Sequence, residues 1–436
     1  MLDLLAVNLF SLLISSEQVP KLQTVDWAAW RSPAWIVALK TPEKVNDPTA
    51  IAATQRHLNS LAAVGMPPGA QGVWLQSGNQ ILAEHQGTRP IPAASLTKIA
   101  TTLAALETWQ PTDQFETVAG VTGELRDGVV QGDLVIQGGG DPLFVWEEAI
   151  ALGNALAQAG IVRVAGNLVI TGKFSMNFKA DPGVAGHFLK RGLNADLWNS
   201  EINTQYAALP AGTPKPRIVI SGEVQVAPTP PSFRPVVRRQ SLPLIQILKA
   251  MNIFSNNHIA DSVAQDLGGG AAIAQKAAAA ARIPPEEIRL INGSGLGEEN
   301  QISPRAVVAM LMTLQQKLQA IDLSVADVLP VIGRERGTLG GRQIIPGAAV
   351  KTGTLNRVSS LAGVIPTRDR GLVWFSILDI GTADLKALHN LQDELLQTLV
   401  NAWGEGSPVP PDLQPSDRIP SYQQVLGDPG RNQVFP

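Results

Sequence analysis

The sequence contains no cysteine, which excludes disulfides, thiolate nucleophiles and cysteine metal sites. Charged residues make up only 16% of the chain, the net charge is -3, and lysine and arginine are scattered rather than clustered. This distribution does not favour electrostatic binding to nucleic acid, so no nucleic-acid partner is expected. No apolar run reaches the roughly twenty residues that a membrane-spanning helix needs.

The N-terminal residues 4–14 form a short apolar stretch whose role the sequence leaves open. The segment before it has no lysine or arginine and contains Asp3, unlike an ordinary signal peptide. Four interpretations remain: a degenerate signal, a mis-chosen start, a helix that makes peripheral contact with a membrane, or an amphipathic helix packed on the first domain. The absence of cysteine suits an oxidising compartment.

Length and apolar content predict a protein of more than one domain. A chain of 436 residues with 44% apolar residues can bury a sizeable core and is long enough for two to three domains. The tail, residues 404–436, is rich in proline, serine, aspartate and glutamine, and we expect an extended or partly disordered extension there.

Three short motifs occur in an order typical of serine acyl-transfer enzymes that react with penicillin. They are Ser95-Leu96-Thr97-Lys98, Ser255-Asn256-Asn257 and Lys351-Thr352-Gly353. The first and third patterns each occur once in the chain, whereas Ser-x-Asn occurs three times. Ser77 comes before Ser95 and so breaks the order of the motifs, and Ser175 lies in a loop-like stretch. Order and flanking residues therefore select Ser255.

A helix predicted over residues 94–109 carries the first motif. Residues three positions apart share a helix face, so the Lys98 amine lies within reach of the Ser95 hydroxyl. The helix start also favours a developing oxyanion. Lys98 can act as a base only if its pKa falls by roughly three units, about 4 kcal/mol, which burial beside a second cation would achieve. Lys351 is the candidate for that cation.

The second motif lies between two apolar helical segments. A polar corner of this kind can hold a site, in which Ser255 would pass a proton and Asn257 would hold the backbone amide of a substrate. The alternative is that Ser255-Asn256-Asn257 only caps a helix. His258, next to the motif, is a weaker candidate for the base.

The third motif is predicted to lie on a strand, residues 349–355. Gly353 removes side-chain bulk where a substrate aligned as an extra strand could approach. The main-chain N–H of Thr354 could then serve as an oxyanion donor together with that of Ser95. A first hairpin is expected over residues 72–85, with its turn at Ser77-Gly78-Asn79, and a second over residues 361–378. A helix is expected over residues 383–403.

Other catalytic classes do not fit the residues. The chain has no His-Glu-x-x-His helix and no Gly-x-Ser-x-Gly elbow, and Gly138-Gly139-Gly140-Asp141-Pro142 lacks the ending of a phosphate loop. That glycine run is interpreted as a sharp turn between a strand and a helix. No metal and no organic cofactor is called for.

Taken together, the motifs resemble the D-alanyl-D-alanine carboxypeptidase and endopeptidase family, also called class C low-molecular-mass penicillin-binding proteins. The resemblance covers about residues 67–403. It is carried by the three motifs with Pro92-Ala93-Ala94 before the first, by Gly138-Gly139-Gly140-Asp141-Pro142, Ser241-Leu242-Pro243-Leu244, Met251-Asn252, Asn292-Gly293-Ser294-Gly295-Leu296, Ser303-Pro304-Arg305 and Gly337-Thr338-Leu339, and by Thr354-Leu355 after the third.

The resemblance implies a mixed α/β (α+β) fold of the penicilloyl-serine transferase type, related to β-lactamases and transpeptidases. An antiparallel sheet with flanking helices would meet an all-helical half at the site, and a β-rich domain would be inserted after the Ser95 helix. Since 160 positions separate Ser95 from Ser255, only one inserted domain is expected. The expected domains are an N-terminal arm (1–66), a discontinuous catalytic domain (67–118 and 236–403), the insert (119–235) and the tail (404–436).

The resemblance also implies a role for each motif residue. Ser95 is the nucleophile, Lys98 its base and Ser255 a proton shuttle. The substrate-binding set comprises Asn257, Lys351, Thr352, Gly353 and Thr354, of which Lys351, Thr352 and Thr354 would bind the terminal carboxylate. Asn256 stands where the family often has aspartate.

The resemblance implies the activity of a serine-type D-Ala-D-Ala carboxypeptidase that acts outside the cytoplasm, in the periplasm or cell envelope. It leaves open whether the protein is also an endopeptidase. The implied partners are peptidoglycan stem peptides and β-lactam antibiotics, which would acylate Ser95. Two alternatives are kept. A non-catalytic cell-wall scaffold would retain the fold, and a β-lactamase would need a glutamate in a Glu-x-x-Leu-Asn segment, which does not occur between Ser95 and Ser255.

Overall fold

The computed structural model describes residues 42–436. The apolar stretch 4–14, with its interpretations as a signal, a membrane contact or a packed helix, lies outside these residues. The described chain forms two compact units. The main unit contains residues 42–111 and 245–420, and the inserted unit contains residues 112–244 and 421–436.

A six-stranded sheet organises the main unit, with the strand order β1-β3-β2-β18-β17-β16. Every neighbouring pair is antiparallel except β1 and β3. Both expected hairpins are present, and Gly78 turns the first of them with a φ of +52°. The strands are β1 (Glu43–Lys44), β2 (Gly72–Ser77), β3 (Gln80–His85), β16 (Ala349–Leu355), β17 (Val358–Thr367) and β18 (Gly371–Ile380).

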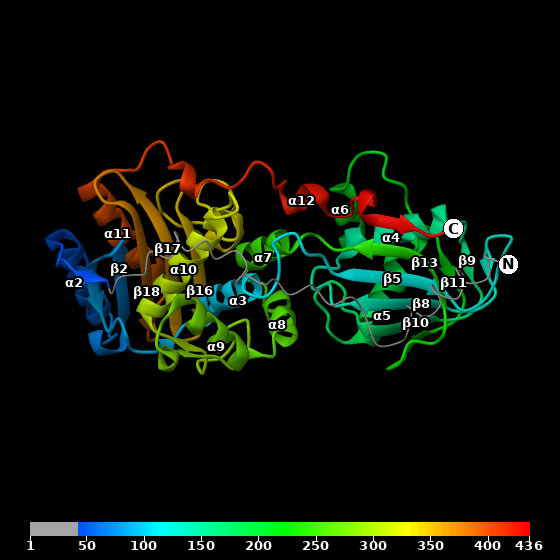
Figure 1. The fold of residues 1–436 in the computed structure, drawn as a ribbon, viewed down its shortest axis with the longest axis horizontal. Coiled ribbons are helices and arrows are strands. Elements are labelled where there is room, and N and C mark those ends of the chain that lie inside the picture. Colours follow the sequence, from blue (N-terminus) through cyan, green and yellow to red (C-terminus); the bar gives the residue numbers. More distant parts are fainter. Residues whose placement is uncertain (1–41) are drawn as a thin grey trace, which may run out of the picture. The chain divides into compact units, whose positions relative to one another are not determined.

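Helices cover both faces of this sheet, as Figure 1 shows. α2 (Pro48–Ala63) packs on α11 (Leu385–Trp403) over one face, and α10 (Pro304–Gln319) contacts β2, β17 and β18. All residues of β17, the strand next to the edge strand β16, are buried, which requires cover on both faces of the sheet. The Asp47 side chain caps α2 by accepting a hydrogen bond from the Ala50 amide, and a proline, Pro48, is the first residue of the helix.

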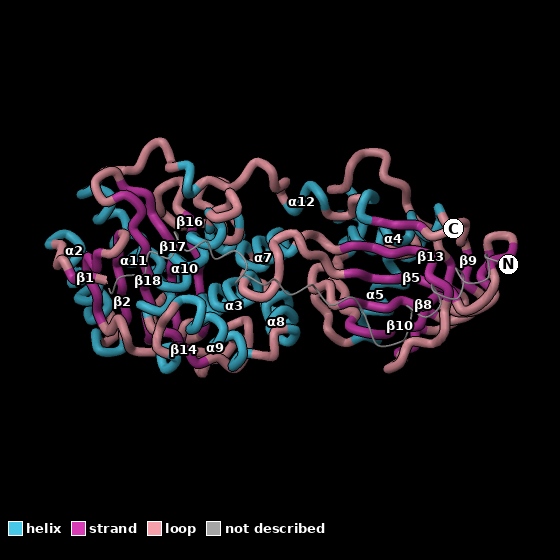
Figure 2. Tube along the Cα trace, in the orientation of Figure 1, coloured by secondary structure: helices cyan, strands magenta, loops and turns pink. Residues whose placement is uncertain are grey.

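The remaining helices form the all-helical half of the main unit (Figure 2). The predicted helix 94–109 is shorter in the structure, because residues 94–96 form a 3-10 turn and the α-helix covers Thr97–Leu106. The helices are α3 (Thr97–Leu106), α7 (Leu244–Ile253), α8 (Asn257–Asp266) and α9 (Gly270–Ala281), and the short strands β4 (Ile91–Pro92), β14 (Ile288–Arg289) and β15 (Gln301–Ile302) form a small sheet beside them. The predicted penicilloyl-serine transferase architecture, a sheet with flanking helices and a helical half, is confirmed.

The inserted unit is a mixed α/β domain, with more helix than the β-rich insert expected from the sequence. Its main sheet has the order β12-β10-β8-β5-β13-β19, and α4 and α5 pack on it and on each other. β8, β10 and β12 run parallel, and parallel neighbours need crossover connections, which the helices provide. The elements are β5 (Glu116–Val121), β8 (Leu134–Gly139), β10 (Leu168–Lys173), β12 (Val224–Val226), β13 (Arg234–Gln240), β19 (Asn432–Val434), α4 (Trp146–Gln158), α5 (Pro182–Gly192), α6 (Ser200–Ala207) and α12 (Tyr422–Val425), with a small sheet of β6 (Leu125–Arg126), β7 (Val129–Val130), β9 (Arg163–Val164) and β11 (Val219–Ile220).

The bounds of this unit are wider than the expected 119–235. Glu116 in β5 pairs with Gln240 in β13, so the strands that enter and leave the unit lie side by side and extend the insert at both ends. The predicted turn after the strand that ends at Gly139 is present, and Gly140 adopts a φ of +95° there.

Residues 421–436 are not the extended or partly disordered extension that the composition predicted. β19 pairs antiparallel with β13, and Arg431 donates to the carboxylate of Glu148 on α4. Glu148 is buried and also accepts from Arg239 on β13. The sequence could not reveal this because the partners of Arg431 lie far away along the chain.

A buried pair, His57 and Asp379, joins α2 to the sheet. His57 Nε2 lies 2.9 Å from an Asp379 carboxylate oxygen, and Nδ1 lies 3.3 Å from the Leu391 carbonyl oxygen. Both neighbours accept hydrogen bonds, so the imidazolium form satisfies both. Burial by itself lowers the pKa of His57, but the charge and hydrogen bond of Asp379 outweigh it, and the pKa is raised above its ordinary value of 6.5.

This pair predicts a loss of stability with rising pH. A raised pKa means that the stabilisation is fully present below about pH 6.5 and is lost as the pH rises through the folded-state pKa. His57→Gln is expected to cost about 1.5 to 3 kcal/mol of unfolding free energy at pH 6, and less at pH 9. Urea unfolding of both proteins at the two pH values tests this, and an equal difference at both would contradict it.

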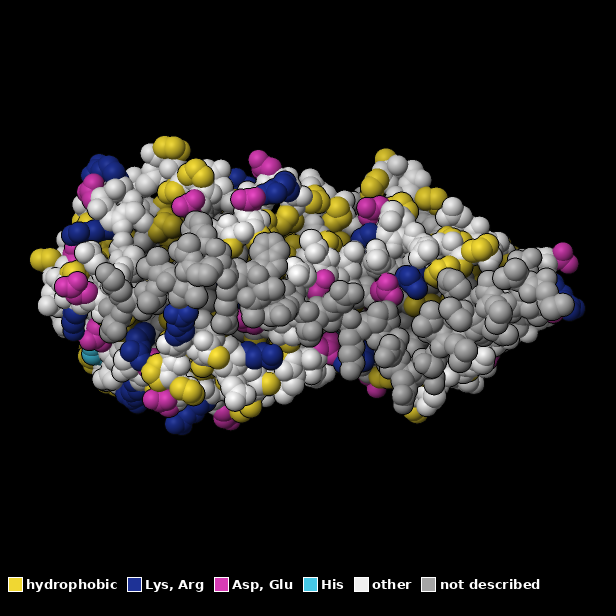
Figure 3. All heavy atoms as spheres, viewed as in Figure 1, with side chains coloured by type: hydrophobic (Ala, Val, Ile, Leu, Met, Phe, Trp, Pro, Cys, Tyr) yellow, Lys and Arg dark blue, Asp and Glu magenta, His cyan; other side chains and the backbone are white. Residues whose placement is uncertain are grey.

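Acidic and basic side chains of the described residues are interspersed on the face that Figure 3 shows. Within residues 42–436, no helix combines the length and apolar character needed to cross a membrane.

Candidate active site

Ser95 lies in the 3-10 turn that leads into α3. The residue before it, Ala94, has a φ of +49°, a conformation that is uncommon for a residue with a side chain. Gly295 lies directly against this turn, because a Cβ atom at Gly295 would stand 1.9 Å from the Ala94 carbonyl oxygen. The turn that presents Ser95 is therefore held in an unusual backbone conformation by a neighbouring loop.

Lys98 is fully buried one turn after Ser95. Its Nζ lies 3.0 Å from Ser95 Oγ, 2.8 Å from Asn257 Oδ1 and 2.7 Å from the main-chain oxygen of Ser294. The amide and carbonyl oxygens can only accept, so they take the two hydrogens of a neutral amine. The lone pair of that amine is then left for the hydroxyl hydrogen of Ser95.

Electrostatics favour this neutral form. Burial lowers the pKa of Lys98 to about 7, although the Asp261 carboxylate raises it. A substantial fraction of Lys98 is therefore a free base near neutral pH.

Lys351 occupies the facing strand, β16, and is also fully buried. Its Nζ donates to Ser255 Oγ at 3.0 Å and to the main-chain oxygen of Thr352 at 2.7 Å. Burial, and then the positive charge of Lys98, lower its pKa well below the ordinary value. Each lysine thus contacts one serine hydroxyl, and the pair disfavours a state with both ammonium charges.

The second motif combines the two interpretations that the sequence left open. Asn256 is the cap of α8 and accepts from the Ile259 amide at 3.0 Å. Ser255, with a φ of +51°, and Asn257 lie on either side of the cap and reach Lys351 and Lys98 respectively.

Gly353 allows β16 to lie against the Ser95 turn. A Cβ atom at Gly353 would stand 2.9 Å from the Ser95 nitrogen and 3.0 Å from the Ala93 oxygen, both backbone atoms. β16 is the last strand in the order of its sheet, and after Ala349 no other described strand pairs with its outer edge. An extended peptide could add to this edge. Thr354 is exposed there.

Thr352 adds a hydroxyl to the site, and the side chain of Thr338 fixes the position of that hydroxyl. Its Oγ1 donates to Thr338 Oγ1 at 2.7 Å. The sequence interpretation gave Thr338 no role, although Gly337-Thr338-Leu339 was among the family motifs.

The loop 292–295 is the part of the site that sequence reasoning missed. The Ser294 carbonyl contacts Lys98, and the main-chain amides of Gly293 and Ser294 donate to Asp261 on α8. Thr101 on α3 donates to the Gly293 carbonyl at 2.7 Å. The only available signal was the Asn-Gly-Ser-Gly run, which supplies backbone groups and so gives no side-chain pattern.

His258 does not take the place of the lysine base in this geometry, because the hydrogen-bond partner of Ser95 is Lys98. Burial lowers the pKa of His258 from its ordinary value. Within residues 42–436, no group of His, Asp and Glu side chains has an arrangement that could hold a metal ion.

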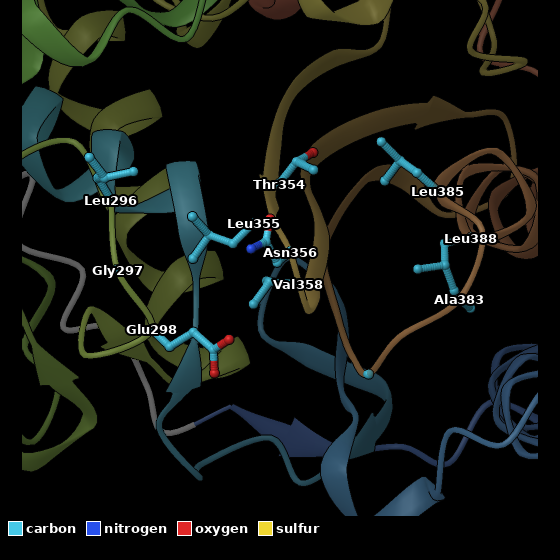
Figure 4. A pocket seen from close by; sticks show the side chains of 11 residues that line it. Leu296, Gly297, Glu298, Thr354, Leu355, Asn356, Val358, Ala383, Leu385 and Leu388 are labelled. Atoms are coloured by element: carbon cyan, nitrogen blue, oxygen red, sulfur yellow. The ribbon is translucent and has the colours of Figure 1, made fainter.

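A pocket of about 640 Å³ opens beside the end of β16 (Figure 4). Thr354, Leu355 and Asn356 line it from the strand end, Leu385 and Leu388 from α11, and Leu296 and Glu298 from the loop after Ser294. Glu298 is the one charged residue in its lining.

Fold and site together define the class. A helix-start serine and lysine, a serine in a turn between helices, and a lysine on an edge strand meet where an antiparallel sheet adjoins a helical half. These are the features of the penicilloyl-serine transferases.

Comparison with known proteins identifies the family within this class to which the chain is similar. The family model of the D-Ala-D-Ala carboxypeptidase 3 (S13) family matches residues 68–183 and 214–401. D-alanyl-D-alanine carboxypeptidase DacB of Haemophilus influenzae is 24% identical over 391 residues, which span 67% of this chain and 81% of DacB. The carboxypeptidase Rv3627c of Mycobacterium tuberculosis is 26% identical over 336 residues, 66% of this chain and 71% of Rv3627c.

The fold is shared with a predatory endopeptidase of Bdellovibrio bacteriovorus, Bd3459, solved acylated by penicillin G and in complex with an immunity protein. The two chains superpose with a TM-score of 0.66 at 23% identity, over 78% of this chain and 96% of that one.

The chain belongs to the D-Ala-D-Ala carboxypeptidase 3 (S13) family. It is thus a serine-type D-alanyl-D-alanine carboxypeptidase or endopeptidase, as the motifs predicted.

Proposed function

We propose that this protein hydrolyses D-alanyl-D-alanine bonds of peptidoglycan stem peptides through an acyl-enzyme on Ser95, and that penicillin acylates the same serine. The observation that carries the proposal is the Lys98 amine, which is buried, has a pKa of about 7 and is hydrogen-bonded to Ser95 Oγ. Since the substrate is peptidoglycan, the protein would act outside the cytoplasm.

In the acylation step, neutral Lys98 takes the proton of Ser95 Oγ while that oxygen attacks the carbonyl carbon. The main-chain amides of Ser95 and Thr354 would stabilise the oxyanion. The carbon–nitrogen bond then breaks, and the proton on Lys98 passes through the hydroxyl of Ser255 to the leaving nitrogen, which leaves Lys98 neutral again. Lys351, which donates to that hydroxyl, supports the transfer.

Substrate binding follows from the edge strand. The peptide would align along the outer edge of β16, which no other described strand covers beyond Ala349. Its terminal carboxylate, or the carboxylate of a penicillin, would be bound by Lys351, Thr352 and Thr354, and the side-chain amide of Asn257 would hold a backbone amide. Water then attacks the ester while Lys98 accepts a proton from it, and the ester bond breaks as Lys98 returns that proton to Ser95 Oγ. This releases the shortened peptide and restores Ser95.

The test is an intact-mass time course of the purified protein with benzylpenicillin, beside Ser95→Ala. We expect one drug adduct that persists in the wild type and does not form in the variant. Release of D-alanine from a peptide that ends in D-alanyl-D-alanine, and cleavage of cross-linked dimers, would measure the two peptidase activities separately.

Other outcomes would overturn the proposal. Rapid loss of drug without a lasting adduct would indicate a β-lactamase. No adduct, no drug loss and no D-alanine release would indicate a scaffold, although the buried Lys98 amine has no evident use in one.

A further inference from the structure

The Ser294 carbonyl is one of the two groups that take the hydrogens of the Lys98 amine, so its position matters for the base. A main-chain carbonyl in a loop has no side chain to fix it. Its position depends on what holds the neighbouring amides.

Asp261 supplies that support. One of its carboxylate oxygens accepts from the Gly293 amide at 3.1 Å and from the Ser294 amide at 2.9 Å. Asp261 follows Asn257 by four positions on α8, so both face the same side of the helix. α8 thus contacts Lys98 directly through Asn257 and indirectly through Asp261 and Ser294.

We propose that Asp261 is a positioning residue for the Ser95 reaction: its carboxylate holds the Ser294 carbonyl on Lys98 and places a negative charge near the base. The two effects act differently. The hydrogen bonds orient the lone pair of Lys98 toward Ser95. The negative charge raises the pKa of Lys98, so that a higher pH is needed before Lys98 is neutral and can act as a base. The proposal rests on the proposed acylation of Ser95.

Few ionisable groups influence this part of the site. Asp261 opposes burial in setting the pKa of Lys98, and Lys351 on β16 carries the second buried amine. His258 on α8 also senses the charge of Asp261, which raises its pKa against the larger effect of burial. A pH profile must therefore separate Lys98 from His258.

The experiment measures the rate of benzylpenicillin acylation from pH 5 to 9 by intact mass. Asp261→Asn keeps an oxygen that can accept from both amides but removes the charge. We expect the midpoint of the acid limb to move down by about one pH unit, the scale on which a nearby opposite charge shifts a pKa. Well below the midpoint, the variant should then reach about a tenfold larger fraction of its own plateau rate than the wild type does.

Asp261→Ala separates positioning from charge. It removes the acceptor as well, so we expect the same downward shift together with a plateau rate lower by about 10- to 100-fold, because the base is misplaced. Asparagine should restore most of this loss. Thermal melting of both variants shows whether the protein remains folded.

Two controls complete the design. Asp266→Asn makes the same substitution at the last residue of α8 and should leave the midpoint in place. His258→Gln should also leave the midpoint of the acid limb in place, because Lys98 and not His258 is the titrating base. An Asp261→Asn midpoint that is unmoved or moves upward would overturn the proposal, whereas failure of the wild type to form any adduct would instead overturn the proposed function.

Discussion

Replacing Lys98 with methionine is expected to slow acylation of Ser95 by benzylpenicillin by roughly 10²- to 10⁴-fold, the range that general-base catalysis contributes. Methionine fills similar space but cannot accept the proton of Ser95. In the wild type, the partner of Ser95 Oγ is the amine of Lys98 at 3.0 Å. Rates of adduct formation from intact mass would measure the effect.

The pH dependence of the acylation rate is a second test of Lys98 as the base. Because the pKa of Lys98 is lowered to about 7 and the neutral amine is the base, the wild-type rate should fall about tenfold per pH unit below 7 and level off above it. Lys98→Met should lose this acid limb. Lys276→Met, an exposed lysine on α9, serves as the matched control and should behave as the wild type. A Lys98→Met protein that acylates within tenfold of the wild type would remove lysine from the mechanism.

Replacing Glu148 with glutamine is expected to destabilise the inserted unit by about 3 to 5 kcal/mol, the cost of leaving buried charges unpaired. Glu148 is fully buried and accepts from Arg239, from Arg431 and from the Gly427 amide. Burial raises the pKa of its carboxyl, but the two guanidinium groups outweigh this and lower it below its ordinary value of 4.5. The stabilisation should therefore be present above about pH 4.5 and be lost as the pH falls through the folded-state pKa.

Denaturant unfolding and limited proteolysis would test this prediction. Early cleavage within residues 421–436 is expected in the variant, because Arg431 anchors that segment to Glu148. Glu124→Gln is the control: Glu124 also pairs with an arginine, but 74% of its side chain is exposed, so its loss should cost about 1 kcal/mol or less. Equal effects of the two substitutions would show that the buried network contributes little.

Local sequence patterns were enough to predict much of this molecule. The three-residue spacing of Ser95 and Lys98 places amine and hydroxyl together on one helical turn, and the hairpins of the sheet follow from short apolar runs around turn residues. The order of the motifs indicated the fold. These features depend on residues close in sequence, where helix and strand geometry fixes their relation.

Features that depend on distant residues could not be predicted in the same way. The contact of Lys98 with Ser294 involves a main-chain oxygen, and no side chain marks it in the sequence. Asp261 is one acidic residue among many on helical faces. The tail was misjudged because its proline-rich composition is that of an extension, whereas Arg431 and β19 find their partners on α4 and β13.

The two paired strands β13 and β19 are synthesised far apart in time. β13 is complete once residue 240 has been made, but its partner strand is made only after the whole remaining main unit. On the ribosome, the edge of β13 would therefore stay open while some 190 further residues are synthesised. An open strand edge is a site for unwanted pairing. The inserted unit therefore cannot complete its sheet until its last strand, β19, has been made.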